Sequence, residues 1–563
     1  MKRIFRVGLP TIISLLAALS VSAVAASSAA AASQASGKLV IDNESGATWT
    51  CQFNPYNPAV TLTSFGFVYE PLEFVDILAK SPSSQTTPWL ATASKWSNGF
   101  KTLSFTIRKG VKWSDGQPFS AADVVYTFNA MKANKAIDLN ALWTNAGGPL
   151  SSVTQKGSSV VFQFKSASQP YFYYVADQTP ILPKHIWSKL NQSKLSSFAD
   201  SNPVGTGPYK VGSCSGQNIK YMANSGYWQS KPGHVIPAIK EVDYPSFLSN
   251  TQANLQLSQG QAQWGGQYVP NIQSFYVAKD PAANHYWFPP VENVSLIPNL
   301  SNPLLGNLAV RQALAYGIDR AKVALIGESG YQQAANQTGV ITPTYSAWYD
   351  KSANKFSYNP SKAIKILEAA GFKRGSGGIF TSKSGQQLSF QIKTISGFSD
   401  WDASLQLITQ QLKQIGIAVS VQDENSGPYT SDLQSGHFQL AYAGSGGPAP
   451  SPGPTPYYEL RGLLYSGNIG STDYSRFNSK ATDALFNQYP GDTPAQQLNV
   501  IHKVEQVMNN QVPLIPVTEG VDWFQYNSKM FSGWPTAANP YAQPSPYQSP
   551  DMGVVLTHLT PTK

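Results

Sequence analysis

The chain has 563 residues, a formal net charge of +9 and only 13% charged residues. A single hydrophobic core stops growing near ~250 to 300 residues, so this length predicts at least two lobes. Lys and Arg are scattered singly, without a basic run, and this argues against nucleic-acid binding.

Residues 1–32 have the pattern of a secretory signal peptide, and 33–37 form a short linker. Basic residues precede an apolar run from Val7 to about Val24, and small residues follow. No cysteine stands near this region, so lipid attachment is not expected, and no later segment reaches the ~20 apolar residues of a membrane span. We expect a periplasmic or extracellular protein associated with the cell envelope.

Two cysteines, Cys51 and Cys214, are present in the whole chain. In an oxidising compartment the two could pair, and two buried free thiols are the alternative; the sequence leaves both open. Cys214 stands between Gly212 and Gly216 in the outline of a nucleophile elbow, but a strand-to-helix context is missing.

The most informative stretch is 101–132. Apolar residues alternate with polar ones over 103–107, which predicts a strand with one buried face. After a Gly- and Pro-containing turn, Ser120 is placed to cap a helix, with Asp123 completing a capping box. The apolar face of this helix consists of Val124, Phe128 and Met131.

Periodicity places further elements along the chain. Residues 388–421 read as a β-α-β unit, and two apolar runs, 294–300 and 512–517, read as strands that cross between lobes. Other strands are expected at 38–41, 160–164 and 438–442, and helices at 250–259, 310–318 and 360–370.

Several of these segments carry a family resemblance. Residues 108–116 (Arg-Lys-Gly-Val-Lys-Trp-Ser-Asp-Gly) and 119–124 closely resemble the signature of the family 5 extracellular solute-binding proteins, the receptors of peptide and oligosaccharide ABC importers. The segments 69–72 and 310–320 resemble further landmarks of the family, and 534–542 resembles its cello-oligosaccharide-binding branch.

The resemblance implies an α/β, two-lobed periplasmic-binding-protein-like fold of type II, in the large three-subdomain class, with two interlobe crossing strands. Lobe I would span 38–295 with an inserted subdomain at about 85–200, lobe II would span 296–512, and 513–563 would return to lobe I. The lobes would close around a ligand like a hinge. The implied partners are an ABC permease and its ATPase, with the protein itself a monomer.

No pattern of catalytic residues emerges. The six histidines are isolated, and neither a His-Glu-x-x-His motif nor a Cys-x-x-Cys pair occurs. We therefore expect no enzyme activity, no metal and no cofactor.

The ligand class is predicted from one loop. Peptide receptors of the family typically place an Asp just after the strand corresponding to 438–442, where it pairs with the α-ammonium of the ligand. Here Gly444 to Pro448 contains no acid, which favours a neutral oligosaccharide such as cellobiose or a longer β-linked gluco-oligosaccharide. An oligopeptide is the alternative, because Glu459 or Asp473 could supply the missing charge.

Aromatic rings and amides are the groups expected to bind a sugar. Trp264, Trp401 and Trp523 rank first because each lies in or beside a segment expected at the cleft or the crossings; core or surface packing is the alternative for each. The remaining candidate ligand-binding residues are Trp49, Gln263, Asn299, Gly446, Tyr457 and Tyr458.

Overall fold

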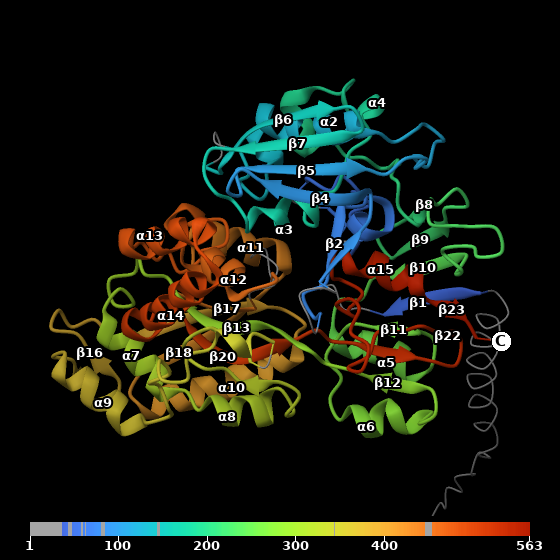
Figure 1. The fold of residues 1–563 in the computed structure, drawn as a ribbon. Coiled ribbons are helices and arrows are strands. Elements are labelled where there is room, and N and C mark those ends of the chain that lie inside the picture. The colour runs from blue at the N-terminus through green and yellow to red at the C-terminus, as the bar shows by residue number, and fades with distance from the viewer. Residues whose placement is uncertain are drawn as a thin grey trace, which may run out of the picture.

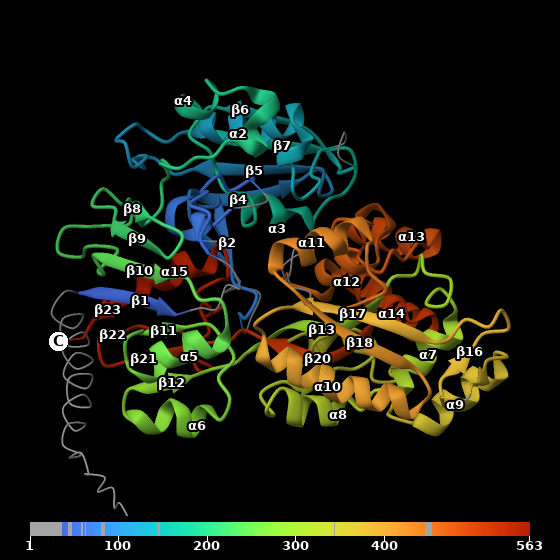
Figure 2. The ribbon, with the colours of Figure 1, turned by 180° about the vertical axis from the view of Figure 1, so that it is seen from behind.

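The computed structural model describes residues 37–42, 48–57, 60–61, 63–79, 85–143, 147–342, 344–375, 377–444 and 453–562. The expected signal peptide and the candidate residue Gly446 lie outside these ranges. The described chain forms two α/β lobes, each built on its own sheet, with a smaller subdomain packed over the first lobe (Figures 1 and 2). This arrangement agrees with the predicted two-lobed fold.

The first lobe contains a seven-stranded sheet in the order β12-β21-β11-β1-β10-β9-β8. The predicted first strand, β1, lies inside this sheet, parallel to both β10 and β11, and its Leu39 and Ile41 are completely buried. The bounds are β1 (Lys38–Asp42), β8 (Tyr209–Cys214), β9 (Asn218–Ala223), β10 (Glu241–Pro245), β11 (Trp264–Gly265), β12 (Asn284–Tyr286) and β21 (Gln525–Asn527).

The subdomain contains the stretch that the sequence singled out. Its antiparallel sheet has the order β4-β5-β7-β6, and α2 (Ala121–Ala133) packs against it. The predicted capping box is confirmed, since the backbone N–H of Ser120 donates to Asp123 Oδ2 at 2.8 Å and the Ser120 hydroxyl accepts from the first turn. The strands are β4 (Ala91–Ser97), β5 (Thr102–Ile107), β6 (Leu150–Lys156) and β7 (Ser159–Phe164).

The second lobe is built on a six-stranded sheet in the order β14-β20-β13-β19-β17-β18. The predicted β-α-β unit is present, because β17 and β18 are parallel and α10 (Ser399–Gln414) connects them. The bounds are β13 (Pro290–Pro298), β14 (Gln333–Ala334), β17 (Ser389–Ile395), β18 (Ala418–Glu424), β19 (Leu440–Gly444) and β20 (Ile515–Val521).

The chain passes between the lobes twice. It leaves β12 at Tyr286 and enters β13 at Pro290, and it returns from β20, which ends at Val521, to β21, which begins at Gln525. β13 and β20 are antiparallel neighbours in the second sheet. Both crossings therefore lie side by side, as a hinge requires.

Helices and short strands complete the two lobes. The first lobe and its subdomain contain α3 (Tyr171–Ala176), α4 (Lys184–Trp187), α5 (Asn250–Ser258), α6 (Ile272–Phe275) and α15 (Asp551–His558). The second lobe contains α7 (Leu308–Gly317), α8 (Arg320–Lys322), α9 (Pro360–Ala369), α11 (Ser426–Ser435), α12 (Pro456–Leu464), α13 (Lys480–Gln488) and α14 (Pro494–Gln511). Paired short strands are β2 (Glu73–Val75) with β3 (Thr86–Pro88), β15 (Lys373–Arg374) with β16 (Phe380–Thr381), and β22 (Phe531–Ser532) with β23 (Thr560–Pro561).

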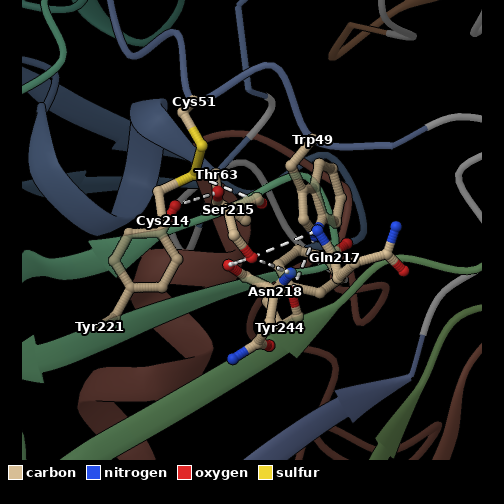
Figure 3. The surroundings of a disulfide bond; sticks show 9 residues. All are labelled: Trp49, Cys51, Thr63, Cys214, Ser215, Gln217, Asn218, Tyr221 and Tyr244. Carbon is tan, nitrogen blue, oxygen red and sulfur yellow. Dashed lines mark hydrogen bonds between the residues drawn. A yellow bond between two sulfur atoms is a disulfide. The ribbon is translucent and has the colours of Figure 1, made fainter.

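Cys51 and Cys214 form a disulfide bond, so the open question of their pairing is answered (Figure 3). The bond ties the segment that follows β1 to the end of β8. Beside it, the indole N–H of Trp49 donates to the carbonyl oxygen of Tyr244 at 2.8 Å, and the two rings are in contact. This segment leads directly into the candidate site.

Candidate functional site

A cavity of about 340 Å³ lies where the first lobe, its subdomain and the crossing strands meet. Its size is at the lower end of the range for small-ligand sites. Its lining includes Tyr56, Asp138, Gln178, Glu292, Asp522 and Tyr547.

The cavity has an acidic lining. Asp138, Glu292 and Asp522 contribute carboxyl groups, and no Lys, Arg or His belongs to its described lining. This local charge is opposite in sign to the net charge of the whole chain. An ionised carboxylate in this lining could pair with a cationic group of a ligand.

Glu292 reaches the cavity from β13, the first crossing strand. Its side chain is half-buried and lies over two glycines on the neighbouring strands. A Cβ at Gly444 would lie 2.8 Å from Glu292 Oε2, and a Cβ at Gly520 would lie 2.7 Å from its Cγ. The Glu292 carboxyl therefore occupies the space that a side chain at position 444 would need.

Asp522 follows the second crossing strand and is only 1% exposed. The side-chain amides of Gln543 and Gln548 donate to its two oxygens at 3.1 and 2.6 Å. Burial outweighs these bonds and raises the pKa of Asp522 to about 7.

Asp138 belongs to the subdomain and accepts hydrogen bonds from the backbone N–H groups of Leu142 and Trp143 at 2.8 and 2.9 Å. Burial raises its pKa above the ordinary value. Opposite it, the Tyr56 hydroxyl donates to the carbonyl oxygen of Pro180 at 2.6 Å. Because Tyr56 follows Cys51 closely, the disulfide helps to hold this wall in place.

Gln263 and Trp264, expected at the cleft, lie in the interior of the first lobe. Gln263 is 1% exposed, and its Oε1 accepts from the backbone N–H of Val40 at 2.9 Å. Trp264 is completely buried, and its indole N–H donates to the carbonyl oxygen of Pro544 at 2.8 Å. The structure thus gives both a packing role; their contact with a ligand stays a prediction.

Trp49 and Asn299 also bond within their own lobes. Trp49 packs on Tyr244 beside the disulfide, as described above. Asn299 is 5% exposed, and its amide donates to the carbonyl oxygens of Gly436 and Phe438, each at 3.0 Å. Neither residue belongs to the described lining of the cavity.

Trp401, Tyr457 and Tyr458 lie in the second lobe. Trp401 is 8% exposed at the start of α10 and packs against Phe398 and Tyr442. Tyr457 stacks on Tyr489 with ring centroids 4.1 Å apart. The ring of Tyr458 contacts Tyr173 of α3, in the subdomain. Tyr458 therefore lies at a contact between the lobes.

Trp523 is the neighbour in the chain of the cavity-lining residue Asp522. It follows Asp522, and its backbone N–H donates to the hydroxyl of Tyr547, a second lining residue. Its half-buried indole lies against the rings of Tyr268, Phe288 and Tyr331. Trp523 itself does not belong to the described lining, and its contact with a ligand stays a prediction.

Sequence reasoning missed the acidic residues, Glu292 above all. A signal for it exists: Glu292 stands two positions before the apolar run at 294–300 that predicts a crossing strand. An acid at a hinge strand is a candidate cleft residue. The acids that were considered, Glu459 and Asp473, are 1% and 0% exposed and do not belong to the described lining.

Within the described ranges, no group of three or more His, Cys, Asp or Glu residues could hold a metal ion. None of the described helices is both long enough and apolar enough to cross a membrane.

Comparison with known proteins agrees with this architecture. The model for bacterial extracellular solute-binding proteins, family 5, matches residues 85–463. The oligopeptide-binding protein AppA of Bacillus subtilis is 29% identical over 351 residues, which are 59% of this chain and 60% of AppA. The nickel-binding periplasmic protein of Escherichia coli is 24% identical over 412 residues, covering 71% of this chain and 75% of that protein. The matched region thus spans less than two thirds of AppA.

Among solved structures, a mannohexaose-bound periplasmic oligopeptide-binding protein from Thermotoga maritima has a TM-score of 0.85 and 25% identity, covering 94% of this chain and 99% of that one. AppA of Bacillus subtilis in complex with a nonapeptide has a TM-score of 0.76 at 23% identity, covering 93% and 99%. The family match covers more than half of the chain, and the fold is that of the two-lobed periplasmic binding proteins. The chain belongs to family 5 of the bacterial extracellular solute-binding proteins.

Proposed function

We propose that this protein is the extracytoplasmic substrate-binding component of an ABC importer, and that it captures a short oligopeptide when its lobes close. The family and the similarity to oligopeptide-binding proteins support the importer role. An ABC permease and its ATPase would receive the loaded protein, which would act as a monomer and without catalysis.

The observation that carries the peptide assignment is the acidic cavity at the crossing strands. Its described lining contains Asp138, Glu292 and Asp522 and no cationic side chain. A peptide presents an α-ammonium, and an ion taken out of water into an enclosed site requires a partner of opposite charge. Glu292, half-buried at the cavity wall, is the residue we assign to it.

This assignment reverses the preference drawn from the loop at 444–448. That loop carries no acid, but Glu292 brings a carboxyl to the end of β19 from the adjacent strand, within 2.8 Å of where a Cβ at Gly444 would lie. An acid at this point of the fold is therefore available without an Asp in the loop.

An oligosaccharide remains the second candidate. The Thermotoga maritima protein, with a TM-score of 0.85, was solved with mannohexaose. The cavity also offers neutral hydrogen-bonding groups, among them Asn140, Gln178 and Gln548, and the ring of Tyr547. The β-gluco-oligosaccharide prediction therefore enters the same experiment.

The test is calorimetric titration of the mature protein with di- to pentapeptides and, separately, with cello- and manno-oligosaccharides. We expect peptides to bind, and the variant Glu292→Gln to weaken them about 10-fold or more, as loss of a hydrogen bond to a charged group does. Glu368→Gln, an exposed position on α9, is the matched control and should bind as the parent does.

Binding of oligosaccharides but not of peptides would overturn the peptide assignment and leave the importer role. Equal peptide affinity in Glu292→Gln and Glu368→Gln would remove Glu292 from the site. Binding of neither class by the folded protein would count against both candidates.

A further inference from the structure

A second cavity, of about 400 Å³, lies at one edge of the second lobe. It borders β14, the edge strand of the six-stranded sheet, and the segment that leads from there to α9. Every residue of its described lining lies between positions 318 and 358, so the first lobe contributes none. The lining of this edge cavity includes Asp319, Arg320, Tyr349, Phe356 and Tyr358.

The edge cavity differs in charge from the acidic cavity at the crossing strands. Its described lining contains one carboxylate, that of Asp319, and one guanidinium, that of Arg320. Burial lowers the pKa of Arg320 to about 10, so this guanidinium is still charged at neutral pH. The two charges cancel over the lining as a whole, and a ligand with a net charge gains little from it.

Both charged groups keep unused hydrogen-bonding capacity. Arg320 is 7% exposed; two of its N–H groups donate to backbone carbonyl oxygens at 2.6 and 3.1 Å, and a third donates to Gln337 Oε1 at 2.7 Å. A guanidinium has five N–H donors, so two have no acceptor in the part of the chain that the structure describes. Asp319 Oδ1 accepts from the backbone N–H of Lys322 at 3.1 Å, and its Oδ2 accepts from no described residue. The lining therefore offers a ligand both donors and an acceptor.

Aromatic rings complete the edge cavity. Tyr358 is 41% exposed and Tyr349 is half-buried, and neither ring contacts another aromatic ring of the described chain. Phe356 is buried and is held by Tyr316, with ring centroids 4.4 Å apart. The two tyrosine rings are thus apolar surface within a polar lining, and a ligand with apolar C–H groups would cover them.

These features together fit a sugar. Each hydroxyl group of a sugar both donates and accepts hydrogen bonds, so it pairs with a carboxylate oxygen and with a guanidinium N–H alike. The C–H groups on the faces of the sugar ring pack on aromatic side chains. A phosphate or carboxylate would be repelled by Asp319, and an ammonium group by Arg320. The volume lies in the lower part of the range for small-ligand sites, which favours a mono- or disaccharide over a longer chain.

We propose that the edge cavity binds a neutral mono- or disaccharide, with Asp319 and Arg320 on its hydroxyl groups and the rings of Tyr349 and Tyr358 against its C–H faces. The site shares no described lining residue with the cavity at the crossing strands. Because only the second lobe contributes to it, the sugar makes the same contacts in the open and closed forms and does not shift the equilibrium between them. The inference goes beyond the proposed function and does not rest on it.

The experiment titrates the mature protein with cellobiose, mannobiose and N-acetylglucosamine, followed by saturation-transfer difference NMR. We expect at least one of these sugars to bind, with millimolar affinity, and to bind equally well to the variant Glu292→Gln. Small-angle scattering should show the same radius of gyration with and without the sugar, since lobe closure is not involved.

Two substitutions test the residues of the edge cavity. Tyr358→Ala removes an exposed ring and should weaken the sugar about 2- to 10-fold, as the loss of one aromatic contact does. Asp319→Asn keeps a residue type that caps helices well and removes the charged acceptor, and it should weaken the sugar about 3- to 10-fold. Neither substitution should change the affinity for the ligand at the crossing strands.

Matched controls exist for both substitutions. Phe100→Ala removes an aromatic ring that is 39% exposed, but on the subdomain. Asp423→Asn changes an exposed carboxylate on β18, at the opposite edge of the same sheet. Both controls should bind the sugar as the parent protein does.

The results separate this proposal from the proposed function. If none of the sugars binds the folded parent protein, the edge-cavity site is wrong, whatever the peptide titration shows. If a sugar binds but Tyr358→Ala and Asp319→Asn bind it as their controls do, the sugar lies elsewhere and the proposal is overturned. If its affinity falls in Glu292→Gln alone, the sugar lies at the crossing strands, which also overturns the proposal. Failure of peptides to bind would count against the proposed function and leave the edge-cavity site standing.

Discussion

The hydroxyl of Tyr458 and the carbonyl oxygen of Pro170 are joined by a 2.8 Å hydrogen bond, although 288 residues separate them in the chain. A second contact joins the lobes at another place, where the Asn250 side-chain amide lies 3.2 Å from Ser399 Oγ and 3.3 Å from Asp400 Oδ1. The lobes therefore meet through specific polar contacts, and such contacts favour the closed form over an open one.

Replacing Tyr458 by Phe should weaken ligand binding about 2- to 10-fold with little loss of thermal stability. The change removes one interlobe hydrogen bond, with a net value of about 0.5 to 1.5 kcal/mol, and keeps the ring. Calorimetric titration measures the affinity, and small-angle scattering of the ligand-free protein should show a larger radius of gyration.

The adjacent residue provides the control for this experiment. The Tyr457 hydroxyl lies 3.5 Å from the carbonyl oxygen of Phe486 within the second lobe, so Tyr457→Phe removes a hydroxyl without touching the lobe contact. It should leave the affinity unchanged. Equal effects of the two variants would mean that the Tyr458 bond does not contribute to closure.

Features set by neighbouring residues could be predicted from the sequence, whereas features set by distant strands could not. The Ser120 and Asp123 capping box depends on residues three positions apart, and it was predicted correctly. Glu292 is different, because its place depends on Gly444 and Gly520, which reach it only through the pairing of β13 with β19 and β20.

The tryptophans illustrate the same limit. Periodicity and composition indicate that a tryptophan side chain is packed against other residues, but not which ones. The surroundings of Trp264 are set by Pro544, 280 residues away, whose carbonyl oxygen accepts a hydrogen bond from the indole N–H. Core and cleft positions look alike in a single sequence, because both demand large apolar rings with one polar group.

Removing the disulfide should destabilise the first lobe. Cys51 and Cys214 are 163 residues apart, and closing so long a loop restricts the unfolded chain, so the double variant Cys51→Ser/Cys214→Ser should lose about 2 to 5 kcal/mol of unfolding free energy. Urea unfolding monitored by tryptophan fluorescence measures this. Reduction of the parent protein should reproduce the loss, and reductant should not affect the double variant. If the reduced parent and the double variant both unfold at the same urea midpoint as the oxidised parent, the prediction is contradicted.

Stability should be highest at acid pH and should fall toward neutrality. Burial raises the pKa of Asp177, Glu505 and Glu519 to about 7. Between the ordinary carboxyl pKa near 4 and pH 7, the folded state therefore holds more protons than the unfolded state, so the unfolding free energy decreases as pH rises through this window. Thermal unfolding from pH 4 to pH 8 should show a falling melting temperature.

Asp177→Asn tests one group in this set. Asp177 accepts from the backbone N–H of Val75 at 2.8 Å, and the carbonyl of Asn can accept the same bond without a charge. Compared with its effect at pH 4, the substitution should raise the unfolding free energy near pH 7 by on the order of 2 to 4 kcal/mol. The dependence of stability on pH should therefore become flatter. The control Glu368→Gln should leave the dependence of stability on pH unchanged. If the pH dependence of Asp177→Asn runs parallel to that of the parent protein, other groups cause it.

A methyl group at position 444 should weaken ligand binding without unfolding the protein. The Cβ of Gly444→Ala would lie 2.8 Å from Glu292 Oε2 and 2.9 Å from Oε1, so the carboxyl end of this side chain must move while the backbone stays. Because Glu292 is the residue assigned to the cationic group of the ligand, its displacement should lower peptide affinity about as much as Glu292→Gln does. Gly427→Ala is the control, since a Cβ there meets no atom within 4 Å. In the double variant Gly444→Ala/Glu292→Gln the two effects should not add, because both act on the same carboxyl group; additive losses would show that Gly444 acts on the ligand by a separate route.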